Sequence, residues 1–502
     1  MGGSQLKKGA FYSYLHLGLT NIGGIIVTPF IIKMLGDSEY GLYTLIGAFV
    51  GYLSILDLGL NNAIVRYVAQ YQAQKDDKGQ ENFLAISLLI YMVIGLIIAI
   101  GGLVMYLNVN RLFGDSLTAS ELEKAKTMLL ILVGNIAITL PGGAFIGICN
   151  GREHFVFPRV LSIAKYVLRT IMVLTILYFG ADALGIVILD TAMNFLFILA
   201  SMYYVFKILK VKVKLHQFEF SFIKEIFGYS IWIFVFALVY QFQWRSGQII
   251  LGSTTNTITV AVYGVGVLLG VYFMTFGNVI NGLILPKAVK SVYNKSSSIT
   301  LTSEMLRVSR VTLILLIYIF GAFLLLGQEF IVLWVGPIYK DSWLVALLIM
   351  VAYIIPISQG YAHAVLEAKK RMRFKSLSSL LLSVLGIGLG GYLSRLYGIH
   401  GMIYGIFSAL LILQLVVAIF YHKQLRINMF TYLRNALIPF LLLLITTTAI
   451  SYLLFQGTDV SWLLFLIKGI VYSLVFLGGL WFTINSQEKE IILNKALNLK
   501  RK

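Results

Sequence analysis

Apolar residues occur in long blocks along this chain of 502 residues, and short polar stretches separate the blocks. Residues 83–106 and 435–456 are two of them. Each is long enough for a helix to cross a hydrocarbon core of about 30 Å at about 1.5 Å per residue. Helices are expected because each span must satisfy its own backbone hydrogen bonds in lipid, and the strict alternation of barrel strands is absent. The pattern predicts an all-α polytopic membrane protein with about fourteen transmembrane helices.

The predicted spans follow one another with short connections, none of which could hold a soluble domain. They cover residues 10–34, 40–68, 83–106, 127–149, 156–179, 184–206, 221–244, 257–285, 308–328, 342–366, 376–396, 399–422, 435–456 and 461–483. The first block is too long for the apolar region of a cleaved signal peptide, so we expect it to be retained as a span.

Charge distribution gives the orientation of the spans. The chain has 40 Lys and Arg residues and a net charge of +19, yet only 12% of its residues are charged, against about 25% in soluble proteins. Most basic residues fall in alternate loops, such as 207–214 and 369–375, and in the tail 500–502. This asymmetry predicts that both termini are cytoplasmic. The basic loops are then explained by the orientation of the spans in the membrane and by contact with anionic lipids. No nucleic-acid partner is therefore expected.

Similar segments recur at an offset of about 216 residues. The matching pairs are 32–36 with 249–252, 150–157 with 367–374, and Gly185 with Gly401. They predict two six-helix lobes in parallel orientation, formed by residues 1–215 and 216–427. Residues 428–502 would add helices 13 and 14 and a cytoplasmic tail. Transporters built this way rock their lobes around a central site, and a monomer is expected because one chain supplies both lobes.

Motifs for catalysis are missing from the sequence. There is no Walker P-loop, no G-x-S-x-G motif and no cluster of Cys or His at metal-ligand spacing; Cys149 is the only cysteine. We therefore predict no catalytic residues, no metal and no cofactor. A membrane-embedded glycan polymerase or ligase is a remote alternative, since it would need a long outer loop with catalytic residues.

Ionisable residues inside the spans are the candidate functional residues. Such groups cost at least about 2.5 kcal/mol at the bilayer centre, so they normally face a partner or a wet cavity. Four pairs lie four residues apart and share a helix face: Asp57 with Asn61, Asn62 with Arg66, Lys165 with Arg169, and Asp190 with Asn194. Two interpretations stay open. Either the charges form interhelical ion pairs that fix packing, or they line a cationic cavity that receives an anionic head group.

Other positions also leave alternatives open. Arg245 would either snorkel at the interface or contact substrate at an outer gate. The glycine-rich eighth span would either pack tightly or line a cavity. Lys468 would either snorkel outward or lie beside a lipid groove.

A family resemblance follows from two segments near the N-terminus. Residues 40–43, YGLY, followed by residues 57–69, DLGLNNAIVRYVA, resemble the second-helix signature of polysaccharide-export flippases. These proteins belong to the multidrug/oligosaccharidyl-lipid/polysaccharide (MOP) exporter superfamily. Residues 30–36, FIIKMLG, are similar to the exit of the family's first helix.

The resemblance implies a flippase in a bacterial plasma membrane. Its cargo would be an undecaprenyl-(pyro)phosphate-linked oligosaccharide, such as a capsule, O-antigen or teichoic-acid repeat unit, moved from the inner to the outer leaflet by alternating access. A glycan polymerase or ligase complex would be a partner. The substrate-binding residues would be Arg66, Lys165, Arg169, Arg245, Asn21 and Asn61, of which only Arg66 and Asn61 lie in the matching motif. Asp57 and Asp190 would couple transport to Na⁺ or H⁺.

Two related activities remain alternatives. A multidrug or cation antiporter of the same superfamily would usually have twelve spans and an acidic cavity, whereas the charges within spans here are mixed to basic. A lipid II flippase would also have fourteen spans, and charge does not exclude it.

Overall fold

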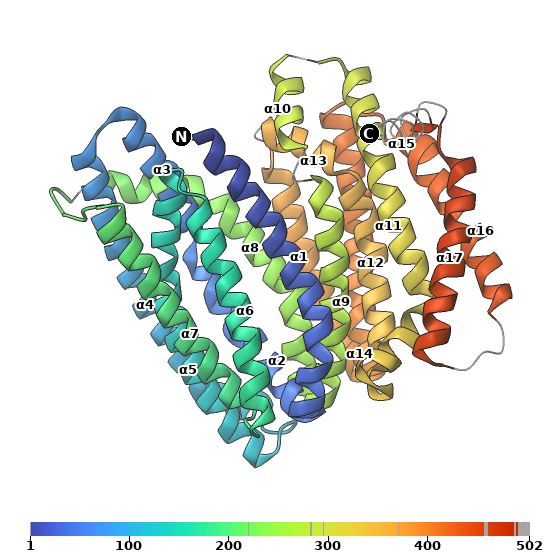
Figure 1. Cartoon of the computed structure of the whole chain (residues 1–502), viewed down its shortest axis with the longest axis horizontal. Helices are drawn as coiled ribbons and strands as arrows, with labels where there is room; N and C mark the ends of the chain where they lie inside the picture. The colour runs from blue at the N-terminus through green and yellow to red at the C-terminus, as the bar shows by residue number, and fades with distance from the viewer. Residues whose placement is uncertain are drawn as a thin grey trace. The chain divides into compact units, whose positions relative to one another are not determined.

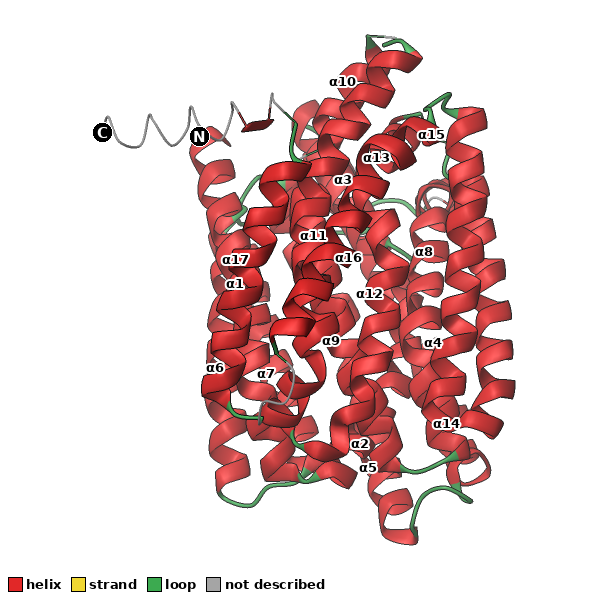
Figure 2. Ribbon diagram, turned by 90° about the vertical axis from the view of Figure 1, so that its right-hand side faces the viewer, coloured by secondary structure: helices red, strands yellow, loops and turns green. Residues whose placement is uncertain are grey.

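A computed structural model describes residues 2–218, 220–281, 284–294, 296–369, 371–455, 460–485 and 488–489, and in this part every regular element is a helix (Figures 1 and 2). Twelve of these helical stretches are long and apolar enough to cross a membrane. The prediction of an all-helical, multi-pass membrane protein is thereby confirmed.

The helices occur in the following order along the chain. The first part contains α1 (Gly2–Leu35), α2 (Asp37–Gly51), the 3₁₀ turn η1 (Tyr52–Asp57), α3 (Leu60–Gln74), α4 (Asp77–Phe113), α5 (Ala119–Gly151), α6 (Val156–Tyr178), α7 (Ala183–Tyr203), the π turn η2 (Tyr204–Ile208) and α8 (Phe220–Thr254). The second part contains α9 (Thr257–Asn281), α10 (Leu285–Tyr293), α11 (Ser298–Val335), η3 (Pro337–Asp341), α12 (Ser342–Ser358), α13 (Gly360–Ala368), α14 (Arg373–Gln424), α15 (Met429–Tyr432), η4 (Leu433–Leu437), α16 (Ile438–Leu454) and α17 (Trp462–Thr483).

The chain forms two compact units. Unit 1 contains residues 1–264 and 379–402, and unit 2 contains residues 265–378 and 403–502. In unit 1, α5 packs against α3, α4 and α7, while α1 packs along α6. In unit 2, α11 packs against α12, α16 and α17. The predicted lobes, with their boundary at residues 215 and 216, remain a prediction.

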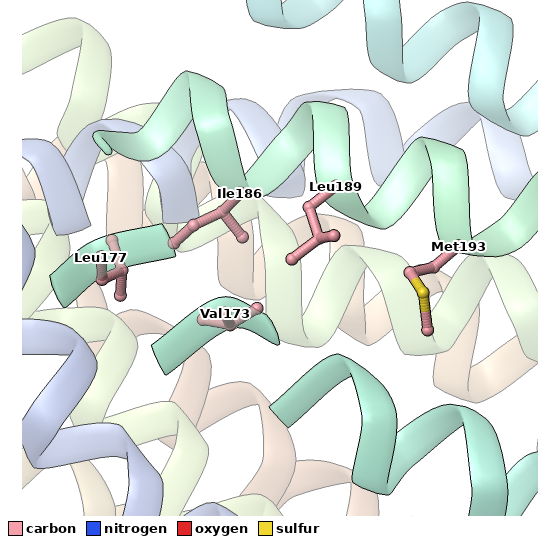
Figure 3. Packing of buried hydrophobic residues seen from close by; sticks show 5 residues of the cluster. All are labelled: Val173, Leu177, Ile186, Leu189 and Met193. Atoms are coloured by element: carbon pink, nitrogen blue, oxygen red, sulfur yellow. The ribbon is translucent and has the colours of Figure 1, made fainter. Parts of the chain in front are cut away.

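Apolar packing holds α6 and α7 together in unit 1 (Figure 3). Val173 and Leu177 of α6 meet Ile186, Leu189 and Met193 of α7, and all five side chains are buried. The spacing of three or four residues places them on one face of each helix. This contact fixes the neighbouring polar residues of the two helices relative to each other.

Helices are interrupted at three places. Two lie inside predicted spans, and one lies at a predicted boundary between spans. The predicted span 40–68 is not one helix, because Leu58 and Gly59 adopt left-handed conformations, with φ of 52° and 75°, between η1 and α3. The predicted span 342–366 is divided at Gln359 into α12 and α13. Helix α14 runs for 52 residues but contains Gly398 with φ 55° and ψ −130°, between the predicted spans 376–396 and 399–422.

The glycines of α9 that lie in unit 2 are packing residues. A Cβ added to Gly266 would lie 2.6 Å from Val345, and one added to Gly270 would lie 2.5 Å from Ile349. Because real side chains do not approach so closely, these glycines let α9 contact α12 directly. Of the two interpretations of this glycine-rich span, tight packing is the one observed at these positions.

Candidate functional site

Lys165 of α6 reaches a row of uncharged polar side chains. Its ammonium donates a short hydrogen bond to Asn194 Oδ1 of α7. The amide of Asn194 donates in turn to Asn135 Oδ1 of α5 at 2.8 Å, and the Thr139 hydroxyl donates to the same oxygen at 2.9 Å. Lys165 therefore lies within a predicted span with a neutral partner, so its positive charge is not balanced by the hydrogen bond that holds it.

A cavity of about 160 Å³ opens beside this row, and both Lys165 and Asn194 line it. Ser162 and Ser201 add hydroxyls, and Gly142 and Gly143 leave room on the α5 side. The volume is below the range of about 300–1,000 Å³ that is typical of pockets for whole small molecules. The space therefore suits one charged group of a ligand rather than a complete oligosaccharide.

Arg169 lies one turn further along α6 and is ion-paired. Its Nε donates to Asp190 Oδ1 at 2.6 Å and its Nη2 donates to Asp190 Oδ2 at 2.8 Å. Two parallel bonds of this kind are the strongest geometry for an Arg–carboxylate pair. Tyr43 of α2 contacts both groups, at 3.4 Å and 3.5 Å. The predicted ion pair of α6 and α7 is thus formed by Arg169 and Asp190, whereas Lys165 faces the cavity.

Asp57 lies at the interruption between α2 and α3. Tyr91 of α4 donates its hydroxyl to Asp57 Oδ1 at 2.9 Å. The following residue, Leu58, has a positive φ, which is uncommon for a residue with a side chain and costs free energy. Discontinuous helices in transporters bring polar backbone and side chains together at substrate and ion sites.

Helix α8 covers this interruption with polar side chains that the sequence did not single out. Gln241 donates to the backbone oxygen of Gly51 at 3.1 Å and to Ser54 Oγ at 3.2 Å. Tyr52 forms a short hydrogen bond with Ser246. Gln241 and Ser246 were missed because neither is ionisable, and only the folded chain reveals the carbonyl group that Gln241 satisfies.

The remaining predicted site residues differ in their surroundings, and Asn61 lies near both Asp57, to which its backbone N–H donates, and Gly143 of the Lys165 cavity. Asn21 is buried, and its amide donates to Leu17 O of its own helix at 2.8 Å. Asn61 packs beside Gly147, and its Oδ1 is buried with no hydrogen-bond partner in the described part of the chain. Arg66 is exposed and lies over the Tyr67 ring at 5.6 Å. Arg245 is half-buried beside Gly51.

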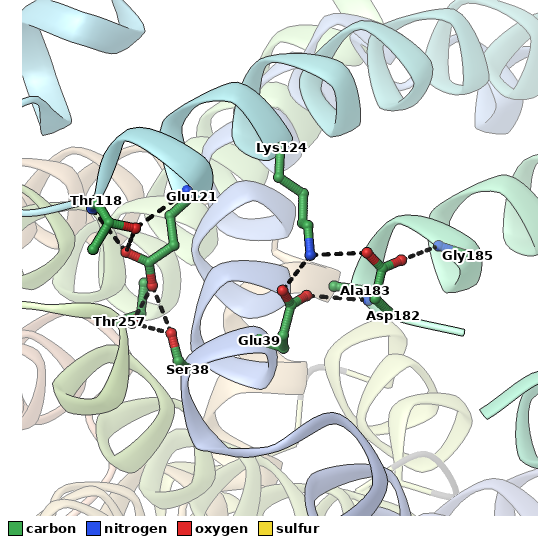
Figure 4. A network of polar contacts seen from close by, with 9 residues as sticks. All are labelled: Ser38, Glu39, Thr118, Glu121, Lys124, Asp182, Ala183, Gly185 and Thr257. Atoms are coloured by element: carbon green, nitrogen blue, oxygen red, sulfur yellow. Dashed lines mark hydrogen bonds and ion pairs between the residues drawn. The ribbon is translucent and has the colours of Figure 1, made fainter. Parts of the chain in front are cut away.

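A polar cluster joins the ends of α2, α5 and α9 that the topology prediction places on the outer side (Figure 4). Ser38 donates to Glu121 Oε1 at 2.5 Å, and Thr257 donates to the same oxygen at 3.0 Å. A Cβ added to Gly41 would lie only 1.9 Å from Thr257 O, so α2 and the start of α9 touch at the backbone. We call Ser38, Glu121 and Thr257 the outer cluster.

Lys124 forms an adjoining contact between α5 and α7 (Figure 4). It is ion-paired with Glu39 and with Asp182, the latter at 2.8 Å. Partial burial raises the pKa of Asp182, but its bonds with Lys124 and with the backbone N–H of Gly185 more than offset this and hold that pKa below its usual range. Asp182 also caps α7 through that bond to Gly185, at 3.1 Å.

Two basic side chains of unit 2 are held in ion pairs, and an apolar cavity lies beside one of them. Lys468 of α17 bonds Glu329 of α11 at 2.6 Å, and Arg310 bonds Glu488 at 2.7 Å. Lys468 does not snorkel outward, because it is only 3% exposed. A cavity of about 270 Å³ between α11 and α17 is lined mainly by apolar and aromatic side chains: Tyr318, Phe323, Phe330, Phe465 and Tyr472.

Interrupted membrane helices beside a small polar pocket are typical of many secondary transporters. The profile of the polysaccharide biosynthesis protein family matches residues 6–293, which is more than half of the chain. The chain belongs to this family. No curated protein matches the sequence.

Solved structures with the same fold come from the MOP superfamily. The lipid II flippase MurJ in an inward closed conformation aligns with a TM-score of 0.70 at 17% identity, covering 94% of this chain and 97% of that one. An inward-facing multidrug resistance MATE family transporter aligns with a TM-score of 0.66 at 14% identity, over 81% and 94%. A MOP superfamily transporter from Pyrococcus furiosus has a TM-score of 0.54 at 14% identity, over 84% and 94%. These likenesses establish the fold, as the resemblance predicted.

Proposed function

We propose that this protein is a flippase that moves an undecaprenyl-(pyro)phosphate-linked oligosaccharide from the inner to the outer leaflet of a bacterial plasma membrane. The cargo would be a capsule, O-antigen or teichoic-acid repeat unit. Such a molecule has an anionic phosphate and polar sugars, which cannot cross about 30 Å of hydrocarbon unaided. A transporter must therefore supply a polar route for the head group and leave the isoprenoid tail in an apolar environment.

The observation that carries the proposal is the position of Lys165. It lies within a predicted span, lines a cavity and has only a neutral hydrogen-bond partner. Lys165 is half-buried, and the nearby Asp190 is already ion-paired with Arg169, so an anionic ligand would stabilise the Lys165 charge. A phosphate group entering this cavity would accept a bond from the ammonium, with Ser162 and Asn194 at hand for further hydrogen bonds.

Arg169 has a positioning role in this proposal. Its bidentate pair with Asp190 fixes α6 against α7 one turn from Lys165, while its charge is already balanced. Asp190 is then a poor candidate for ion coupling, since both of its carboxylate oxygens already accept hydrogen bonds from Arg169. Asp57, whose partner is the Tyr91 hydroxyl, is the better candidate for coupling to Na⁺ or H⁺.

The apolar groove of unit 2 supports a lipid-linked cargo. It is lined by aromatic residues of α11 and α17, and the latter corresponds to the predicted fourteenth span. An isoprenoid tail is a flexible hydrocarbon that can pass from lipid into such a groove at little cost in free energy, because both surroundings are apolar.

By alternating access, fourteen helices would give the cargo a route across the membrane. Helix α8 and the division of α14 at Gly398 add two spans to the twelve candidates, and an even number is consistent with both termini in the cytoplasm. The outer cluster joins α2 and α5 of the predicted first lobe to the start of α9 in the predicted second. We propose that this contact closes the outer side and opens when cargo is released.

A flipping assay tests the proposal. Proteoliposomes that contain the purified protein and a fluorescent polyprenyl-diphosphate-linked oligosaccharide are exposed to a membrane-impermeant quencher, which detects cargo in the outer leaflet. We expect protein-dependent flipping that exceeds that of empty liposomes. The same rate in empty and protein-containing liposomes would reject the function.

Two parallel arms separate the alternatives. Lipid II is the second candidate cargo, because the chain shares the fold of a lipid II flippase over nearly its full length. Faster flipping of lipid II than of other lipid-linked glycans would favour that activity. Imposed Na⁺ and H⁺ gradients test the coupling ion, and a rate that is indifferent to both would remove coupling from the proposal.

A further inference from the structure

A second polar cavity lies entirely within unit 2, apart from the Lys165 pocket. Its volume is about 400 Å³, and its walls come from α9, α12, α13 and the start of α14. This volume falls within the range of pockets that hold whole small molecules. The lining combines amides, an ammonium, an imidazole, a carboxylate and an aromatic hydroxyl: Asn278, Asn281, Tyr353, His363, Glu367 and Lys375.

The interruption between α12 and α13 forms one wall of this cavity. Asn281 of α9 donates to Ile357 O at 3.0 Å, which satisfies a carbonyl group near the end of α12. Gly360 is required there, because a Cβ on it would lie 1.9 Å from Asn281 Oδ1. That oxygen is buried and has no hydrogen-bond partner among the described residues. Asn281 therefore helps to fix this wall, and the exposed Asn278 carries the amide that a ligand in the cavity can reach.

His363 of α13 and Lys375 of α14 supply two donors in a fixed arrangement elsewhere in the lining. Lys375 Nζ lies 3.0 Å from His363 Nδ1 and 3.1 Å from the Tyr421 hydroxyl. An ammonium group has no lone pair, so Nδ1 must accept and the His363 proton must sit on Nε2. The imidazole is therefore neutral and remains a donor through Nε2. These two contacts use two of the three N–H groups of Lys375, and the third is available to another acceptor.

The charge balance of the cavity selects the chemical class of the ligand. Lys375 and Glu367 both line it, so neither an isolated anion nor an isolated cation is matched by the site. The lining offers both hydrogen-bond donors and acceptors, from its amides, its carboxylate and its N–H groups. Neighbouring hydroxyl groups of a sugar require both kinds of partner. Pro356 and Ala364 supply small apolar surfaces, and Tyr353 an aromatic one, against which C–H groups can pack.

We propose that this cavity of unit 2 is a saccharide-binding subsite that recognises hydroxyl groups of an uncharged sugar residue. The proposal rests on the proposed function in one respect, since the sugar would be part of the lipid-linked cargo. Within that function the two cavities divide the head group, with Lys165 binding phosphate and the unit 2 cavity determining which glycan is accepted.

The test uses free sugars, so it requires no transport. The full-length protein in nanodiscs is titrated with glucose, galactose, N-acetylglucosamine and their β-1,4-linked disaccharides, and binding is followed by saturation-transfer difference NMR. At least one sugar is expected to bind saturably and to resist competition by excess glycerol. Absence of saturable binding across this panel, or displacement by glycerol alone, would overturn the proposal.

Two variants locate the binding. Asn278→Leu and Glu367→Gln alter exposed side chains at the cavity. The first removes a hydrogen bond and the second converts a charged hydrogen bond to a neutral one, and each is expected to weaken sugar binding about tenfold. Lys340→Ala removes an exposed charge elsewhere in unit 2 and is expected to bind as the wild type does. Unfolding temperatures confirm that the variants remain folded. Unchanged affinity in both cavity variants would place the sugar elsewhere and overturn the proposal.

The outcome is separable from that of the flipping assay. If the wild type binds sugar through this cavity but does not flip lipid-linked glycans, the proposed function fails and the subsite stands. If flipping occurs but no sugar binds here, the subsite fails and the proposed function stands.

Discussion

Two lysines in predicted spans, Lys165 of unit 1 and Lys468 of unit 2, have opposite surroundings. Lys468 is bonded to the carboxylate of Glu329 and lies 6.0 Å from the centre of the Phe455 ring, with only 4% of its side chain exposed. Lys165 is bonded to the neutral amide of Asn194 and lines a cavity. The first charge is neutralised by the protein itself, whereas we propose that the second binds an anion of the cargo. A charged residue within a membrane is therefore a functional candidate only after its partner is known.

The largest expected effect comes from breaking the pair in unit 2. Lys468→Met leaves the Glu329 carboxylate facing an apolar side chain, and removing one partner of a buried pair typically costs about 3–5 kcal/mol. The variant should unfold at a clearly lower temperature in a thermal assay of the purified protein. The double variant Lys468→Met/Glu329→Gln should recover most of the loss. A single variant as stable as the wild type would contradict the structural role of this pair.

The next effect concerns transport and not stability. Lys165→Met removes the charge that we assign to phosphate binding, and a charged hydrogen bond contributes about 1.5–3 kcal/mol, or roughly 10- to 100-fold in rate. Flipping in proteoliposomes should fall by that factor while the unfolding temperature changes little. Lys340→Ala serves as the control for loss of one positive charge. A normal flipping rate in Lys165→Met would show that Lys165, like Lys468, has only a structural role.

Arg169 and Asp190 should behave as a coupled pair. Arg169→Met leaves Asp190 without its two charged hydrogen bonds and should destabilise unit 1 by about 1.5–3 kcal/mol. Arg169→Met/Asp190→Asn should be more stable than the single variant, as a double-mutant cycle on unfolding temperatures will show. If the losses of stability in Arg169→Met and in Asp190→Asn simply added in the double variant, the ion pair would contribute nothing to stability. Arg169 would then again be a candidate for substrate contact.

The smallest effect lies at the exposed Lys124–Asp182 contact. Asp182→Asn keeps the side-chain oxygen that caps α7 but removes the charge, so the expected cost at pH 7 is about 0.2–1 kcal/mol. Because the folded-state pKa of Asp182 is lowered, the contact stabilises the protein at neutral pH. Its contribution is lost as the pH falls from about 4 through the folded pKa.

Thermal unfolding of wild type and Asp182→Asn at pH 7 and at pH values near 4 measures this difference. Asp182→Ala, which removes both the charge and the cap, should be less stable than Asp182→Asn at either pH. A gap between wild type and Asp182→Asn that widens on acidification would contradict the assigned direction of the pKa shift.

The helical fold could be predicted from the sequence because long apolar blocks have few alternatives in lipid. The boundaries of most spans, and the break between residues 396 and 399, lie close to their observed positions. The interruption at Leu58 and Gly59 was not predicted. Asp57, Gly59 and Asn61 do interrupt the apolar pattern there, but they were assigned to one continuous span. The positive φ of Leu58 itself leaves no compositional signal.

The candidate site could be predicted only in part. The i,i+4 spacing placed Lys165 beside Arg169 and Asp190 beside Asn194 on shared faces, but it did not say which cation meets which polar partner. That depends on the rotation of α6 against α7, which their apolar contacts set. Gln241 and Ser246 remained hidden for a similar reason: uncharged polar residues are common in helices, and only tertiary packing gives them partners.

Binding of the carrier phosphate tests the central claim most directly. A fluorescent short-chain polyprenyl diphosphate without sugars is titrated into wild type, Lys165→Met and the control Lys340→Ala in nanodiscs. The dissociation constant should rise about 10- to 100-fold in Lys165→Met, and it should be unchanged in the control. Equal affinity of the wild type and Lys165→Met would contradict the account, because the phosphate would then not bind at the cavity of unit 1.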